Sequence, residues 1–298
     1  MKYTRRGTIR KQMFCIGIRR LLVVLTIMIA VALGVTTEAW AYEIYDDATG
    51  GDCTLIGTWD DTTKTCTLNT DVYETIQIQG SNITLDGADY TLSGLNSGNG
   101  IVIPSSVQGV TIKNLTLTGW GAVGSNDAAI NISGSYPSSL GNHTVQNNTI
   151  TGSSRGIWLI YTNGNTLSGN TITGSYYYGI HGVFTTNDNT ISGNVISSTT
   201  NGSGITIGSS GNTLSGNTAN SNSNNGMNIS GSNTLTGNTA NGNGERGISV
   251  GGSGHILSGN TASSNGHAGI RLNDSSFNTL SGNTASFNGW GGITLWSD

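Results

Sequence analysis

The stretch Asn212-Thr-Leu-Ser-Gly-Asn217-Thr-Ala219 decides the fold, because the chain repeats it with small changes. The asparagine that closes each copy recurs at intervals of 21 to 24 residues, at Asn148, Asn170, Asn194, Asn217, Asn238, Asn260 and Asn283. A period of about 20–50 residues is the signature of a solenoid, a propeller or an array. The glycine, asparagine and β-branched content excludes helical repeats, and a propeller blade needs about 40 residues. The repeat therefore predicts a β-solenoid.

A second short motif, Gly-Ile-x-Leu and its variants, lies between copies, as at Gly156-Ile-Trp-Leu159 and Gly269-Ile-Arg-Leu272. Its alternating apolar positions predict a short, half-buried strand. Three strands and their corners fill one repeat, so we predict an all-β fold, a right-handed parallel β-helix of about ten coils. Equivalent residues would stack in its core, with one file formed by Leu167, Ile191, Leu214, Leu235, Leu257 and Leu280.

The corner asparagine of each copy is predicted to stack into an amide ladder, in which each side chain hydrogen-bonds the neighbouring coils. A second file begins halfway along the chain and contains Asn222, Asn243, Asn265 and Asn288. We interpret both files as structural.

These repeats resemble those of parallel β-helix proteins of the pectin-lyase-like superfamily, in particular NosD-type and carbohydrate-binding-and-sugar-hydrolase-like β-helix domains. Ile83-Thr-Leu-Asp86 resembles their usual first coil, and Val110-Thr-Ile-Lys-Asn114 resembles the next. The resemblance covers residues 76–298. It implies the fold, but many unrelated functions use this fold, so an activity has to be argued from the site.

The first part of the chain, residues 1–41, predicts a signal peptide. Seven basic residues precede the apolar run Leu21–Val35, and Ala39-Trp40-Ala41 has small residues where a signal peptidase reads. The run is 15 residues long, whereas a membrane span needs about 20. We expect cleavage before Tyr42, with an uncleaved anchor as the alternative. The mature chain would have no membrane span and would be extracellular, on the cell surface or periplasmic, by Sec or twin-arginine export.

Residues 42–75 lie outside the repeats and contain Cys53 and Cys66. An even pair of cysteines in an oxidising compartment predicts a disulfide. We expect this segment to be a cap that covers unpaired strand edges at one end of the β-helix of residues 76–298. A two-cysteine metal site is the alternative, but no CxxC pattern or nearby histidine accompanies the pair.

The charges limit the partners of the protein. Charged residues make up 9% of the chain, and residues 42–298 contain 5 basic and 15 acidic residues. So few basic residues exclude a nucleic-acid partner. An acidic protein needs a bridging divalent cation to bind an acidic polysaccharide. Calcium would serve, but no calcium or other metal site is recognisable, and no cofactor is expected.

One cluster has the residue types of acid–base chemistry. The alignment of the repeats places Glu245 and His267 on adjacent coils, about one strand spacing (~4.8 Å) apart. With Arg271 nearby, such a pair could transfer protons on an acidic sugar, and Arg246 and Asp274 could help to bind it. A solvated surface pair is the alternative. The chain has neither the Gly-His-Gly of polygalacturonases nor the Asp-Pro-His of mannuronan epimerases.

A second cluster is aromatic. Trp158 and His181 hold the outward position of successive motifs, Tyr177 and Tyr178 precede His181, and Trp290 lies near the C-terminus. Ring faces along a solenoid suit stacking against the apolar faces of sugars. Ordinary surface aromatic residues are the alternative. The four histidines of the chain are expected in different columns, so no copper site is predicted.

Together these features favour a non-catalytic module that binds a carbohydrate or a cell-envelope glycan. The alternatives are a polysaccharide lyase, epimerase or hydrolase that uses the Glu245 cluster, and a structural spacer or NosD-like accessory protein. The last coil leaves Leu280, Ala285, Ile293 and Leu295 without a neighbour. We therefore also expect end-to-end self-association or a further C-terminal segment.

Overall fold

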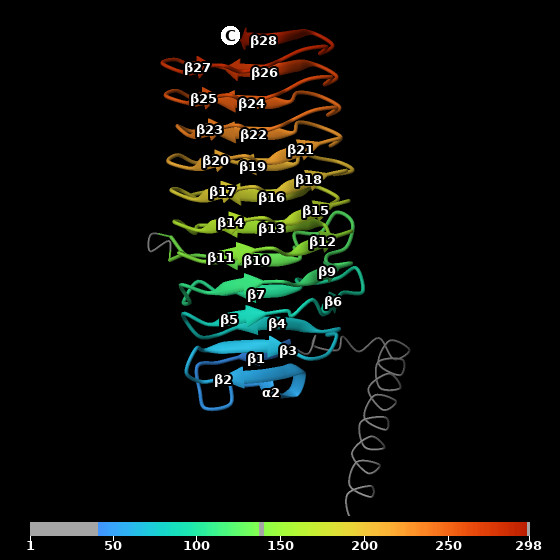
Figure 1. The fold of residues 1–298 in the computed structure, drawn as a ribbon, viewed down its shortest axis with the longest axis vertical. Helices are drawn as coiled ribbons and strands as arrows, with labels where there is room; N and C mark the ends of the chain where they lie inside the picture. Colours follow the sequence, from blue (N-terminus) through green and yellow to red (C-terminus); the bar gives the residue numbers. More distant parts are fainter. Residues whose placement is uncertain (1–40, 137–139, 297–298) are drawn as a thin grey trace, which may run out of the picture. The chain divides into compact units, whose positions relative to one another are not determined.

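The computed structural model describes residues 41–136 and 140–296, and the predicted signal peptide, apart from Ala41, lies outside the described residues. The described chain is a parallel β-solenoid of about ten turns (Figure 1). Its helical content within this part is one short helix, α2 (Cys53–Ile56). The predicted all-β solenoid of about ten coils is confirmed.

Three sheets run along the solenoid. In spatial order, sheet A contains β1 (Ala41–Ile44), β4 (Thr75–Ile78), β7 (Ile101–Ile103), β10 (Ile130–Ser133), β13 (Arg155–Ile160), β16 (Tyr178–Val183), β19 (Ile205–Ile207), β22 (Met227–Ser230), β24 (Ile248–Gly251), β26 (Ala268–Asn273) and β28 (Gly291–Trp296). Sheet B contains β2 (Gly57–Asp60), β3 (Thr65–Leu68), β5 (Thr84–Asp86), β8 (Thr111–Lys113), β11 (Thr144–Gln146), β14 (Thr166–Ser168), β17 (Thr190–Ser192), β20 (Thr213–Ser215), β23 (Thr234–Thr236), β25 (Ile256–Ser258) and β27 (Thr279–Ser281). Sheet C contains β6 (Thr91–Ser93), β9 (Thr116–Thr118), β12 (Thr149–Thr151), β15 (Thr171–Thr173), β18 (Val195–Ser197) and β21 (Thr218–Asn220).

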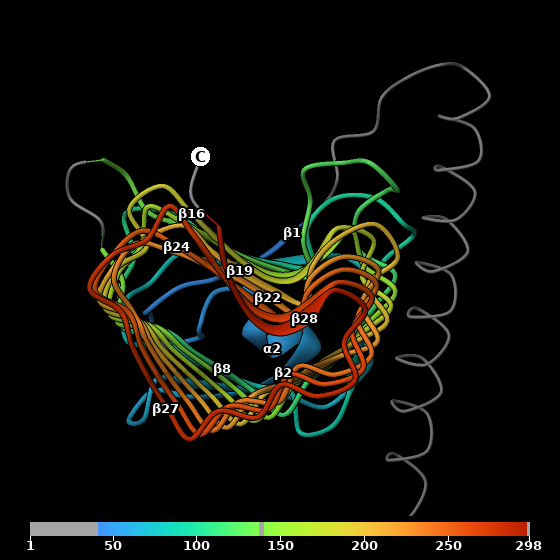
Figure 2. The ribbon, with the colours of Figure 1, turned by 90° about the horizontal axis from the view of Figure 1, so that it is seen from above.

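Sheets A and B lie on opposite sides of the core, as the view along the stack shows (Figure 2). The pairing keeps equivalent residues in register, so Leu167 of β14 lies beside Ile191 of β17, and Ile191 beside Leu214 of β20. This predicted file is fully buried as far as Leu257 and only partly buried at Leu280. Each buried leucine or isoleucine contributes about 1.5–3 kcal/mol relative to an exposed one.

Sheet C ends at β21, where the inward residues become smaller. Ile172 and Ile196 fill the core of this sheet in β15 and β18, whereas Ala219 takes the same position in β21. Beyond β21 the sheet continues only as isolated bridges between threonines. At the next corner the coils are joined instead by the second asparagine file, which contains Asn222, Asn243, Asn265 and Asn288. Each Oδ1 in this file accepts hydrogen bonds from the backbone N–H and the Nδ2 amide of the preceding asparagine.

The corner asparagines form a buried ladder. The backbone N–H and the Nδ2 amide of Asn194 both donate to Oδ1 of Asn217, at 3.0 and 2.9 Å. The same Nδ2 donates to the backbone oxygen of Leu167 at 2.8 Å. This pattern continues on both sides, through Asn148, Asn170, Asn238, Asn260 and Asn283. The ladder therefore satisfies backbone groups that the corner would otherwise leave unpaired in the interior.

A third ladder was not recognised from the sequence. It runs through the first asparagine of each repeat, in the order Asn165, Asn189, Asn212 and Asn233. His143 and His255 occupy the same column, so the expectation that the four histidines lie in different columns is wrong for these two. An imidazole nitrogen can accept the same hydrogen bond as an amide oxygen. In the ladder, Nδ1 of His143 accepts a hydrogen bond from the backbone N–H of Val110 at 3.2 Å.

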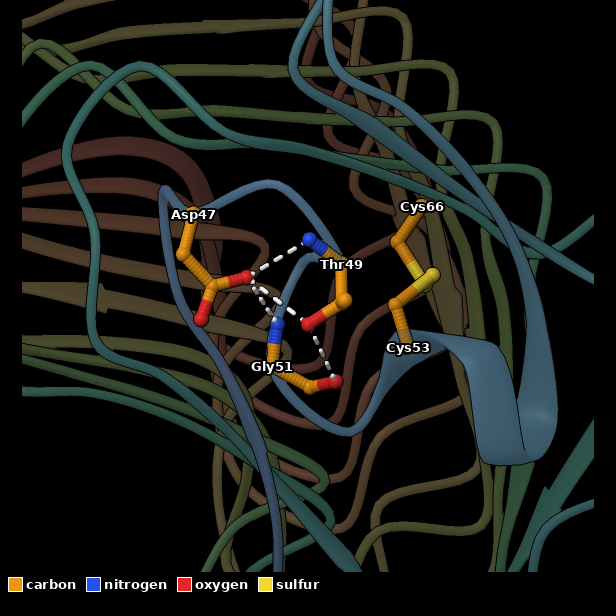
Figure 3. Close-up of a disulfide and its surroundings, with 5 residues drawn as sticks. All are labelled: Asp47, Thr49, Gly51, Cys53 and Cys66. Carbon is orange, nitrogen blue, oxygen red and sulfur yellow. Dashed lines mark hydrogen bonds between the residues drawn. A yellow bond between two sulfur atoms is a disulfide. The ribbon is translucent and has the colours of Figure 1, made fainter.

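Cys53 and Cys66 form the predicted disulfide, which ties α2 to β3 (Figure 3). The turn before α2 is held by Asp47, whose Oδ1 accepts the backbone N–H groups of Gly51 and Thr49 at 3.0 and 2.8 Å. These hydrogen bonds, from Gly51 and then Thr49, lower the pKa of the Asp47 carboxyl.

Residues 42–75, expected as a cap outside the solenoid, also supply its first strands. Strand β1 pairs with β4 and β3 pairs with β5, both in parallel, so sheets A and B begin within this segment. Only a smaller part of this segment covers the end of the solenoid. Within it, β2 runs antiparallel to β3 and is the outermost strand of sheet B at this end. The helix α2 lies inside the outline of the coils when the stack is viewed from above (Figure 2).

At the other end, β27 and β28 are the outermost strands of sheets B and A. Their apolar side chains are less covered than those of other coils, and Leu295 of β28 is 79% exposed. The rings of Trp290 and Trp296 are themselves mostly exposed and do not bury this surface.

Candidate functional site

The aromatic residues singled out in the sequence meet on the outer face of sheet A. In β13, Ile157 and Leu159 point into the core and are fully buried, so Trp158 between them points outward. The register of β13 with β16 places Trp158 beside His181 and Arg155 beside Tyr178. The strand alternation that builds the core therefore also aligns these side chains in pairs on two neighbouring coils.

Arg155 was not predicted as a site residue, but it organises this cluster. Its side chain is only 7% exposed, and its guanidinium carbon lies 4.6 Å from the ring centroid of Trp158 and 5.3 Å from that of Tyr177. Nη1 donates to the backbone oxygen of Ser125 at 3.0 Å, and Nη2 donates to Oδ1 of Asn126 at 3.1 Å. Both acceptors belong to the turn 119–129, which connects β9 to β10.

The rings are packed against one another. His181 stacks on Tyr178 with ring centroids 4.1 Å apart, and it lies nearly parallel to Trp158 at 6.4 Å. Burial, followed by the charge of Arg155, lowers the pKa of His181 to about 4. His181 is therefore neutral at neutral pH, and one of its ring nitrogens can accept a hydrogen bond.

Several buried polar atoms of this face have no hydrogen-bond partner. Among the residues that the structure describes, twelve buried side-chain nitrogen or oxygen atoms lack one. Seven of the twelve belong to strands of sheet A or to the two residues before β24 and β26: Arg155, Trp158, His181, Thr206, Arg246, His267 and Arg271. A buried polar atom without a partner is uncommon, so a concentration on one face requires an explanation such as a bound molecule.

The predicted acid–base residues lie on the same face, closer to the C-terminus. Glu245 and His267 are on adjacent coils, joined by a backbone hydrogen bond. Their side chains face other partners, because the Glu245 carboxylate pairs with Arg246 at 3.1 Å and the His267 ring stacks on Trp290 at 4.1 Å. No ion pair or hydrogen bond joins the carboxylate to the imidazole within the described chain.

Arg271 and Asp274 complete this second cluster. The guanidinium carbon of Arg271 lies 4.5 Å from the ring centroid of Trp296. Asp274 follows β26 and donates its backbone N–H to the oxygen of Trp296 at 2.9 Å. Four strand steps separate Arg271 from His181 along sheet A, which corresponds to about 19 Å. The two clusters are therefore distinct sites on one face.

The stacked parallel coils, with side chains gathered on one outer face, define a β-helix repeat protein. The family model of the right-handed β-helix region matches residues 74–240, more than half of the chain, so the protein belongs to the right-handed β-helix family. A second model, described as periplasmic copper-binding protein (NosD), matches residues 203–298. No curated protein matches the chain.

Two solved structures illustrate the likeness in fold. A mutant of the periplasmic alginate epimerase AlgG is 18% identical with a TM-score of 0.65, over 89% of this chain and 68% of that chain. AlgG itself is 16% identical with a TM-score of 0.54, over 80% and 67% of the two chains. At these identities the likeness shows the fold alone.

The copper in the NosD description has no matching group of ligands here. In residues 41–136 and 140–296, no three His, Cys, Asp or Glu side chains gather as metal ligands would. His143 and His255 are buried in the third ladder, and Cys53 and Cys66 are joined to each other. These residues do not fit a copper centre. The described part of the chain also contains no helix long and apolar enough to cross a membrane.

Proposed function

We propose that the protein is an exported glycan-binding module, with its binding site on the outer face of sheet A around β13 and β16. The observation that carries the proposal is the coincidence of stacked rings with unpaired polar atoms on this face. Nε1 of Trp158, Nε of Arg155 and Nδ1 of His181 all lack partners within this one cluster. Sugars match both the stacked rings and the unpaired polar atoms, because their C–H faces stack on rings and their oxygens accept hydrogen bonds.

The energetics favour a ligand with many acceptor oxygens. Each buried donor left unpaired costs about 1–3 kcal/mol, and a ligand that pairs with it recovers this cost on binding. Indole and guanidinium groups donate and do not accept. Of the five basic residues in 42–298, three lie on this face, namely Arg155, Arg246 and Arg271. Hydroxyl-rich sugars therefore suit the face better than an amine-bearing ligand does. Uronate sugars also suit it, because the three arginines make this face locally basic although the chain as a whole is acidic.

Export rests on three supporting observations. The sequence of residues 1–41 has the pattern of a signal peptide. The Cys53–Cys66 disulfide is typical of an oxidising compartment. The NosD model that matches residues 203–298 is described as periplasmic.

An enzyme acting on the same polymer is the second candidate. The observation that favours it is the group of Glu245, His267 and Arg271, in which Nδ1 of His267 and Nε of Arg271 are unpaired. The Glu245 carboxylate could then accept a substrate proton only if its ion pair with Arg246 were broken. His267 would transfer a proton while its ring remains stacked on Trp290. This geometry supports binding more directly than proton transfer between the two residues.

A binding array with matched variants tests the proposal. The mature chain is applied to immobilised trimers and hexamers of mannuronate, galacturonate, glucose and N-acetylglucosamine. Binding to one class that falls about tenfold or more in Trp158→Ala, while Phe287→Ala binds normally, supports the module. Phe287 is the control because it is an exposed aromatic residue away from this face. No binding to any class would favour a structural spacer.

The same samples separate binding from catalysis. Uronate polymers are incubated with the protein, and the ultraviolet absorbance of unsaturated sugars and the size of the products are followed. The module leaves the polymers unchanged. A product that forms with the wild type and disappears in His267→Ala would instead assign an enzyme to the second cluster.

A further inference from the structure

A row of aromatic rings borders sheet A on the side opposite Tyr178. Tyr161 and Phe184 directly follow β13 and β16, and their rings stack at 4.5 Å with an interplanar angle of 6°. Tyr136 lies 6.4 Å from Tyr161 at the same border. The rings are open to solvent, since Phe184 is 60% and Tyr136 is 76% exposed. No periodic pattern marks these rings in the sequence, because the turns differ from coil to coil.

The backbone at the two stacked residues is unusual for large side chains. Tyr161 and Phe184 have φ values of 51° and 62°, in the left-handed region. The residues that follow β22 and β24 are Gly231 and Gly252, which also have positive φ. Glycine adopts this conformation freely, whereas a residue with a bulky side chain does so at a cost. Phe277 and Phe287 share this conformation, so the backbone alone does not mark a site; what distinguishes Tyr161 and Phe184 is that their rings stack on each other.

One face of this stack is uncovered. On the side of Phe184 away from Tyr161, the next coil provides Gly208 and Ser209 at this border. The Ser209 hydroxyl donates to the backbone oxygen of Phe184, so it is held against the main chain. Neither residue is large enough to cover the ring, which leaves a flat apolar surface at the border of the sheet.

These rings continue the site around Trp158. Arg155, Trp158 and Tyr161 follow one another at three-residue intervals on one coil, and Tyr178, His181 and Phe184 do so on the next. Three residues of strand span about 10 Å, so the ring platforms recur along the strand direction. Along the solenoid, by contrast, the residue that follows His181 in register is the small Thr206.

We propose that Tyr161 and Phe184 form a second sugar-stacking subsite, so that the glycan lies parallel to the strands of sheet A and not along the solenoid axis. This inference rests on the proposed glycan-binding function, and it specifies the direction and minimum length of the ligand. A short oligomer reaches the Trp158 platform alone, whereas a longer oligomer reaches both platforms.

The test compares chain lengths in matched variants. Affinities for the disaccharide and the hexamer of the class that binds in the array are measured for the wild type, Phe184→Gly, Tyr161→Gly and Phe277→Gly. Glycine keeps the left-handed backbone, and Phe277 is a matched control, 93% exposed with a φ of 56°. We expect Phe184→Gly and Tyr161→Gly to weaken hexamer binding about tenfold and to leave disaccharide binding unchanged. Phe277→Gly should change neither.

The negative results separate a failure of the proposed glycan-binding function from a failure of the second subsite alone. If the wild type binds no oligomer, the proposed function itself fails. If Trp158→Ala abolishes binding but Phe184→Gly leaves hexamer affinity unchanged, only the second subsite is wrong. Equal losses for disaccharide and hexamer would indicate a disturbed fold and would also overturn the second subsite. Sedimentation of the unliganded protein provides the last check, because self-association that disappears in Phe184→Gly would assign the rings to a contact between copies.

Discussion

His255 accepts the backbone N–H of Asn233 through Nδ1 at 3.3 Å, at a ladder position where the coils of Asn189, Asn212 and Asn233 each use an asparagine oxygen. Its Nε2 lies 3.1 Å from the backbone oxygen of Gly251 and so carries the proton. Burial lowers the pKa of His255, which keeps the ring neutral and able to accept. An imidazole in this ladder makes its hydrogen bonds sensitive to acid, unlike those of an amide.

His143 should make the solenoid less stable in acid. Burial lowers its pKa from 6.5 to about 4. Below pH 6.5 the unfolded chain binds this proton more readily, so stability is fully present above that pH and falls as the pH drops through about 4. The full loss is about 3 kcal/mol. We predict that His143→Asn, which restores the amide, removes much of the difference between urea unfolding at pH 7.5 and at pH 4. The exposed, non-titrating variant Phe277→Gly should keep that difference, and an unchanged difference in His143→Asn would contradict the assignment.

Asn217 should be among the most sensitive polar positions. Its Oδ1 accepts two N–H groups of Asn194, and its Nδ2 donates to the backbone oxygen of Ile191 at 2.7 Å. Asn217→Ala leaves buried groups unpaired at about 1–3 kcal/mol each, so we expect a loss of roughly 2–4 kcal/mol. Hydrogen exchange of β17 and β20 reports this loss directly. Asn224→Ala, at an exposed position, is the control and should stay within about 0.5 kcal/mol of the wild type. A similar effect in both variants would argue against a special role of the ladder.

The disulfide should stabilise mainly the first coils. Cys53 and Cys66 are 13 residues apart, and closing a loop of this size contributes about 3 kcal/mol. In a solenoid each coil contacts only its neighbours, so the loss remains local. We predict that the Cys53→Ser, Cys66→Ser double variant exchanges amide hydrogens faster in β3 and β5, with β17 and β20 unchanged. Uniformly faster exchange along all coils would show that the solenoid unfolds as one unit.

Protection should fall toward the C-terminal coils. Strands β27 and β28 are the outermost strands of their sheets, and Leu280 is less buried than the leucines below it. We predict faster amide exchange in residues 279–296 than in residues 166–196 of a monomeric sample. Equal protection in a demonstrated monomer would mean that the terminal coil is stabilised by contacts other than stacking. Protection that rises with protein concentration would instead confirm end-to-end association.

The fold could be predicted from the sequence because a solenoid repeats its inward residues. The residues equivalent to Leu214 and Asn217 recur at the same place in each copy of the repeat, so both files can be identified from the sequence alone. The site could be predicted only where it follows the same period. Trp158 and His181 hold a repeated outward position, so their pairing was expected. Arg155 was missed because its partners lie in the irregular turn 119–129. The partners of Glu245 could not be predicted, since the choice between His267 and Arg246 depends on side-chain rotamers and not on spacing.

The indole N–H signal of Trp158 provides the most direct test of the central claim, because Nε1 is buried and unpaired in the free protein. In ¹H–¹⁵N spectra of the mature chain, the signal is assigned by its absence in Trp158→Phe and followed while the best-binding oligomer of the array is added. We expect this signal to shift on saturation, as for a donor that gains an acceptor, while the indole signals of Trp59 and Trp120 stay in place. A ligand that binds and leaves the Trp158 signal unmoved, or that moves only Trp290 and Trp296, would contradict the claim.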